Sequence, residues 1–138
     1  MKPLESLTRL ATQYRALQFY AHMAHNLTSG PTFFQDHEFF GELYPAYESA
    51  YDGLIERVIG LGGNPDIAET NITAANVLKI ANDKNAQEFF ARILASEKGI
   101  QGMIDEAIKT QTQGTQNFLQ GLADDSEVRV YKIQQRLK

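Results

Sequence analysis

The pattern of apolar and polar residues predicts a chain that is almost entirely helical. Apolar residues recur three and four positions apart through most of the sequence, which is the spacing of one face of an α-helix. No stretch alternates in the manner of a β-strand. Glycine and proline interrupt the pattern at residues 28–31 and 62–65. The helices predicted on this basis cover residues 4–27, 38–61, 74–81, 85–110 and 115–137.

Four of these helices are long, and the short one lies between the second and third long helices. The segment joining those two is long enough for a crossover connection along a bundle. With 138 residues the chain can bury one core. We therefore expect an all-α fold: a single domain over residues 1–138, built as a four-helix bundle with a short extra helix.

Residues that can bind a metal are concentrated in the first half of the chain. All three histidines fall within residues 22–37, and two carboxylates one helical turn apart follow on the second helix. Two imidazoles with two carboxylates suit Fe(II), Mn(II) or Zn(II). The candidate ligands are His25, His37, Asp52 and Glu56. His22 lies one turn before His25 and is either a surface residue or an additional ligand.

The length of the second helix restricts how these four residues can meet. His37 and Asp52 are separated by roughly 22 Å along a helix, whereas a metal–ligand bond is only about 2 Å long. His25 and His37 can meet across the Gly-Pro loop, and Asp52 and Glu56 share one helical face. A twofold axis between antiparallel copies would bring one chain's histidines beside its partner's carboxylates, in two identical sites. The spacing therefore predicts an intersubunit metal site.

Composition excludes several other functions. The absence of cysteine excludes disulfides and thiolate sites and fits a cytoplasmic protein, and no apolar run reaches the ~20 residues of a membrane span. A net charge of −4 argues against nucleic-acid binding driven by bulk charge. A di-iron site inside one bundle needs Glu-x-x-His pairs, which the sequence lacks. Among the remaining carboxylates, we expect Glu48 and Glu97 to face solvent.

Residues 20–65 carry a set of motifs that resembles the Dps family of miniferritins, within the ferritin-like superfamily. The motifs are His25 with its Gly30-Pro31-Thr32-Phe33-Phe34 continuation, His37-Glu38-Phe39-Phe40, Asp52-x-x-x-Glu56-Arg57 and Leu61-Gly62-Gly63-Asn64-Pro65. The resemblance implies a dodecamer built from twofold dimers that oxidises Fe(II) with hydrogen peroxide or dioxygen and stores ferric mineral. It also implies that His25, His37, Asp52 and Glu56 are both the metal ligands and the catalytic residues of a ferroxidase that protects against oxidative damage.

The chain departs from the family pattern at several positions. Gly41 stands where the family often has Asp, and Asn26 where it usually has Trp. The site is therefore either mononuclear or weakened at a second iron position. Residues 111–117 are uncharged where the family has an acidic iron-entry pore, so ferrous entry is expected to be slower or to use another path.

The basic residues near the chain ends are few. Only three residues precede the first predicted helix, and Lys132, Arg136 and Lys138 lie near the other end. Twelve copies at −4 each would carry about −48, and phosphate contacts drive DNA binding. We expect DNA binding to be weak or absent.

Two alternative functions also fit these residues. One is a Dps-like shell or dimer protein that binds a metal but has little ferroxidase activity. The other is a non-redox Zn(II) or Mn(II) site that stabilises a dimer, since four ligands match tetrahedral zinc.

Overall fold

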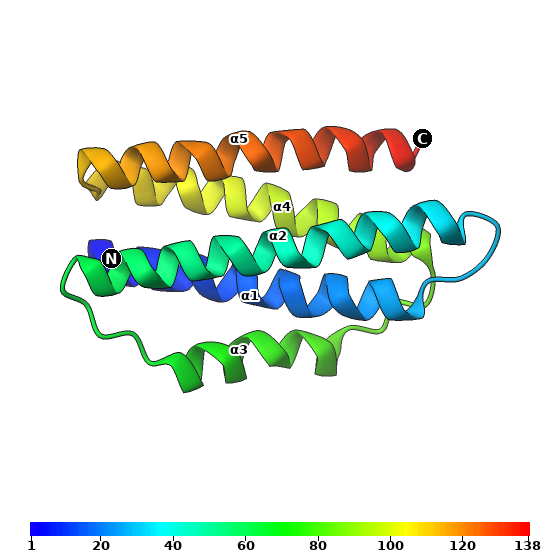
Figure 1. The fold of residues 1–138 in the computed structure, drawn as a ribbon, viewed down its shortest axis with the longest axis horizontal. Helices are drawn as coiled ribbons and strands as arrows, with labels where there is room; N and C mark the ends of the chain where they lie inside the picture. The colour runs from blue at the N-terminus through cyan, green and yellow to red at the C-terminus, as the bar shows by residue number, and fades with distance from the viewer.

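The computed structural model describes all 138 residues and contains five α-helices and one 3-10 turn (Figure 1). Helices α1, α2, α4 and α5 lie side by side as a bundle, and the shorter α3 lies outside it, next to α1. The expected all-α fold, with four long helices and a short one, is confirmed. The elements are α1 (Pro3–Leu27), α2 (Phe33–Gly60), α3 (Ile67–Ile80), α4 (Ala86–Ala107), η1 (Ile108–Thr110) and α5 (Gln113–Arg136).

The short helix is longer than the sequence pattern predicts. It begins at Ile67 instead of residue 74, because the Asp66 side chain accepts a hydrogen bond from the Glu69 N–H at 2.9 Å and caps the first turn. Few of its residues are buried, so its apolar periodicity is weak in the sequence. In one chain, α3 leaves four large apolar side chains exposed: Ile67, Ile72, Leu78 and Ile80.

Helix α2 also begins earlier than predicted, at Phe33 instead of residue 38. Gly30, with a φ of 101°, makes the turn that brings the chain back from α1. His37 therefore lies inside the helix, in its second turn. The helix continues unbroken through Pro45 to Gly60, so the separation of His37 from Asp52 along one helix holds in the structure.

The core lies where the four long helices meet and consists of 26 buried residues. The largest fully buried side chains of this core are aromatic. Phe40 of α2 stacks on Phe90 of α4 with ring centroids 4.5 Å apart. This apolar contact fixes the end of the bundle at which α1 finishes and α2 begins.

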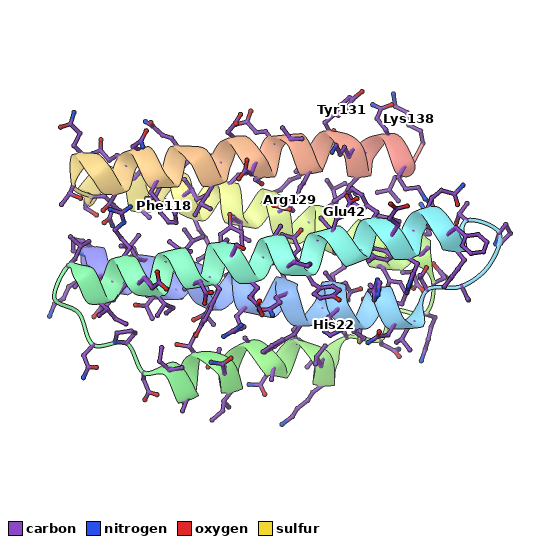
Figure 2. The ribbon with its side chains drawn as sticks, in the orientation of Figure 1. His22, Glu42, Phe118, Arg129, Tyr131 and Lys138 are labelled. Carbon is purple, nitrogen blue, oxygen red and sulfur yellow. The ribbon has the colours of Figure 1, made fainter.

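The expectation that Glu97 faces solvent is wrong. Glu97 of α4 is completely buried and accepts hydrogen bonds from Tyr47 Oη at 2.7 Å and Ser126 Oγ at 2.8 Å. Arg129, which projects from α5 into the bundle (Figure 2), forms an ion pair with it. A buried carboxylate is tolerated where its charge and lone pairs are all matched in this way. Glu48, by contrast, is exposed as expected.

No helix of the structure has both the length and the apolar character needed to cross a membrane.

We expect Arg129→Met to lower the free energy of unfolding by about 3–5 kcal/mol, because Glu97 would remain buried without its partner. The double variant Glu97→Leu/Arg129→Met should be less destabilised than the sum of the two single variants. Urea denaturation at equal protein concentration measures each effect.

The matched control is Lys109→Met, which breaks the exposed ion pair with Glu106. This change should alter stability by less than about 1 kcal/mol. An Arg129 variant no less stable than the Lys109 control would contradict the role assigned to the buried pair.

Candidate metal centre

The turn between α1 and α2 brings two of the predicted ligands together. His25 lies in the last turn of α1 and His37 in the second turn of α2. Their imidazole rings are stacked, with centroids 3.8 Å apart and planes inclined by 19°. The sequence predicted this pairing across the Gly-Pro loop, and the structure confirms it.

Two crossed hydrogen bonds hold the pair. His25 Nδ1 lies 2.7 Å from the His37 carbonyl oxygen, and His37 Nδ1 lies 2.7 Å from the His25 carbonyl oxygen. Because a carbonyl can only accept, each Nδ1 must carry the proton and donate it. In the neutral imidazole this leaves a lone pair on each Nε2, which is the form that binds a metal.

The His25 carbonyl explains why the second bond forms. The last four carbonyls of a helix have no helical N–H partner, and His25 lies within that last turn of α1. His37 supplies the missing donor. Each histidine side chain therefore stabilises the backbone that carries the other histidine. The same two hydrogen bonds position the imidazole pair and satisfy the end of α1.

Aromatic rings surround the pair. Phe33 stacks on His37 with ring centroids 4.8 Å apart, and Tyr44 meets His25 edge-on at 5.4 Å. The His22 ring is 6.3 Å from that of His25 and stacks on Tyr44 at 4.1 Å. His22 is exposed on α1 (Figure 2). It stays a candidate ligand adjacent to the pair.

Asp52 and Glu56 do not reach the histidines within one chain. Both lie on the exposed side of α2, in its second half, and neither has a hydrogen bond or ion pair inside the subunit. The subunit brings no group of three or more histidine, aspartate or glutamate side chains together as a metal site. One chain thus presents a pair of imidazoles and, separately, a pair of exposed carboxylates.

Sequence reasoning missed the buried carboxylate of Asp36, the residue before His37 on α2. Asp36 is buried, accepts from Arg136 Nε and Nη2 at 2.9 Å each, and accepts from Thr32 Oγ1 at 2.6 Å. Burial raises the pKa of Asp36, but the hydrogen bonds from Arg136 and Thr32 outweigh it and hold the pKa below its usual value. The available signal was the core-facing position of Asp36, four residues before Phe40.

This contact also corrects the grouping of Arg136 with the terminal lysines. Arg136 is engaged with Asp36, and its guanidinium lies 5.1 Å from the centre of the Phe90 ring. The pair fastens the start of α2 to the end of α5. It positions the second turn of α2, where His37 lies.

We expect removal of a buried structural carboxylate to lower the free energy of unfolding much more than removal of either exposed candidate ligand. With a chelator present, Asp52→Ala and Glu56→Ala should change the free energy of unfolding by less than about 0.5 kcal/mol, because both side chains are exposed and unpaired. Asp36→Ala should cost about 1–3 kcal/mol, because Arg136 and Thr32 lose a buried, charged hydrogen-bond acceptor. Urea denaturation measures all three, and equal losses would contradict this division.

The comparison with known families agrees with this architecture. The family model described as the ferritin-like domain matches residues 7–138. The "DNA protection during starvation protein" of Brevibacillus brevis is 25% identical over 133 residues, which cover 93% of this chain and 89% of that protein. The protein of the same name from Helicobacter pylori strain J99 is 24% identical over 139 residues, covering 96% and 93%.

Solved structures share the fold. Dps from Staphylococcus aureus superposes with a TM-score of 0.86 at 19% identity, covering 99% of this chain and 95% of its own. Dps from Vibrio cholerae, described as a ferritin-like diiron-carboxylate protein, gives 0.88 at 19% identity, covering 99% and 89%. The resemblance to Dps proteins is confirmed, and the chain belongs to the ferritin-like family.

Proposed function

We propose that this protein oxidises Fe(II) at sites shared by two subunits and stores the ferric product inside an oligomeric shell. The observation that carries the proposal is the division of the ligands within one chain. The imidazoles of His25 and His37 are fixed by hydrogen bonds where α1 ends and α2 begins. The unpaired carboxylates of Asp52 and Glu56 lie further along α2. Iron storage and protection are the general role of the ferritin-like family to which the chain belongs.

Each half-site contributes different chemistry to the proposed reaction. His25 and His37 offer neutral nitrogen ligands that suit Fe(II). Asp52 and Glu56 of the partner subunit would add negative charge, which favours the more highly charged Fe(III) and so lowers the cost of electron loss. Two Fe(II) ions, one hydrogen peroxide and two protons then give two Fe(III) and two water molecules. Dioxygen is the alternative oxidant.

The exposed apolar residues of α3 support assembly. Ile67, Ile72, Leu78 and Ile80 are too large a set of exposed apolar side chains to be ordinary for one short helix of a monomer. We propose that they are covered by further copies of the chain, in a dodecamer built from twofold dimers.

A second candidate function is a metal-binding shell or dimer with slow oxidation. It is favoured by the first turn of α5, which contains no acidic residue. Its Thr112 and Thr115 side chains are hydrogen-bonded to each other at 2.8 Å, in the helix cap. A pore lined by this segment would not attract Fe(II) by charge. Metal that binds without accelerated ferric formation would identify this second function, with Zn(II) or Mn(II) as the bound ion.

Complementation between inactive variants tests the shared site. His25→Ala and Asp52→Ala should each abolish accelerated oxidation of Fe(II) by peroxide. A mixed dimer of the two has one site with both defects and one intact site, because each chain supplies what the other lacks. Co-expression at equal levels with random pairing should therefore restore about a quarter of the sites, measured as the initial rate of ferric absorbance.

Co-expression of His25→Ala with His37→Ala is the matched control, because every mixed dimer then has a defective histidine in both sites. Affinity tags of two kinds on the two chains verify that mixed particles form. Mixed His25→Ala and Asp52→Ala particles that are no more active than this control would overturn the shared site.

We expect no binding of DNA at physiological salt. Arg136 is engaged with Asp36, which leaves Lys132 and Lys138 as the basic side chains at that end of α5. The remaining charge is too small to replace the counterions of a duplex. A gel-shift titration at about 0.15 M salt measures this, and a shift that weakens steeply with added salt would contradict it.

A further inference from the structure

The exposed side of α2 carries a third carboxylate in line with the two candidate ligands. Glu48 is exposed and lies one helical turn before Asp52, which in turn lies one turn before Glu56. With about 100° of rotation per residue, Glu48 lies about 20° around the helix axis from His37 and about 40° from Asp52. A partner subunit that presents Asp52 and Glu56 to this chain therefore presents Glu48 as well.

A buried amide fixes the Glu48 side chain. Gln18 of α1 is only 9% exposed, and its Nε2 donates to Glu48 Oε2 at 2.8 Å. Arg15 Nη1 donates to Gln18 Oε1 at 2.8 Å, which sets the orientation of the amide. Glu48 Oε1 makes no hydrogen bond within the subunit and is available to a ligand. Because the side chain is already fixed, metal binding would cost it little further conformational entropy.

The twofold symmetry of the proposed site determines where this carboxylate arrives. In an antiparallel pair of α2 helices, one turn toward the start of the partner's helix is one turn toward the end of this one. With the partner's Asp52 beside His37, the partner's Glu48 should lie about one turn further on, toward Tyr44. At that level α1 presents His22, whose ring stacks on Tyr44 with centroids 4.1 Å apart.

His22 is available as a ligand. Its side chain is exposed and makes no hydrogen bond within the subunit. Its ring centroid is 6.3 Å from that of His25, whereas a metal–nitrogen bond is about 2 Å long. A metal bound by His22 would therefore be adjacent to the metal bound by His25 and His37, but distinct from it.

Charge and electron count favour two ions in the shared site. Three carboxylates with neutral imidazoles would leave one negative charge unmatched by a single divalent ion. The proposed oxidation uses two Fe(II) for each hydrogen peroxide. Two adjacent ions supply both electrons at one site, whereas a single ion supplies only one.

We infer that His22 and the partner subunit's Glu48 form a second divalent-metal position in each shared site. The partner's Asp52 lies between the two positions and can bridge them. This inference rests on the proposed function, since it uses the same twofold axis. It gives the second position a carboxylate from the partner, where Gly41 supplies none from this chain.

Equilibrium dialysis with Co(II) and no oxidant, followed by metal analysis, tests the inference. Wild-type protein should bind about two Co(II) per subunit, while His22→Phe and Glu48→Gln should each bind about one. His22→Phe keeps a ring to stack on Tyr44, and Glu48→Gln keeps an oxygen that accepts from Gln18. The double variant should also bind about one, because both residues belong to the same position.

Glu42→Gln is the matched control. Glu42 is exposed on the same helix (Figure 2), but it lies about 120° around the helix axis from Glu48. This variant should bind about two Co(II) per subunit, like the wild type. A loss equal to that of Glu48→Gln would show that surface charge binds the additional Co(II), and would overturn the inference.

The remaining outcomes separate this inference from the proposed function. A Glu48→Gln variant that still binds two Co(II), or a wild-type protein that binds only one and loses it in His25→Ala, would overturn the second position and leave the shared site standing. A wild-type protein that binds no Co(II), or a His25→Ala variant that binds as much as the wild type, would overturn the shared site and with it this inference.

Discussion

The continuity of α2 is the constraint on which the candidate site depends. This helix runs without interruption from Phe33 to Gly60, so its rise of about 1.5 Å per residue keeps His37 and Asp52 far apart. The bundle core and the Asp36–Arg136 pair hold the helix at its first turns, while the buried Glu97 binds it through Tyr47 near its middle. No internal rearrangement short of breaking this helix could close the site within one chain.

The carboxylates discussed above are of two kinds: buried ones that stabilise the fold through ion pairs, and exposed ones that are free to bind a ligand. Glu97 and Asp36 are buried, paired with arginine and fully hydrogen-bonded, which is the condition under which a charge can be buried. Asp52 and Glu56 are exposed and unpaired. His25 and His37 combine both roles, because each uses Nδ1 for the backbone and keeps Nε2 free.

Most of the architecture could be predicted from the sequence, because helical periodicity and Gly-Pro breaks are local signals. The beginning of α3 could not, since its start is set by the Asp66 cap and little of it is buried. Pairing of His25 with His37 followed from the short loop. The burial of Glu97 and Asp36 depended on arginines 32 and 100 residues away in sequence.

In the proposed site the ligands are divided between two ends of α2, so the chemistry would depend on assembly. On this proposal an isolated subunit would hold two half-sites and no complete one, so newly made chains would be inert toward ferrous ions until they pair. Metal binding and association would then be thermodynamically linked, each strengthening the other by mass action. Ferric iron would then form only at sites where two subunits are already paired. These sites would lie in the wall of the proposed shell, so the product would not be released by free monomers in solution.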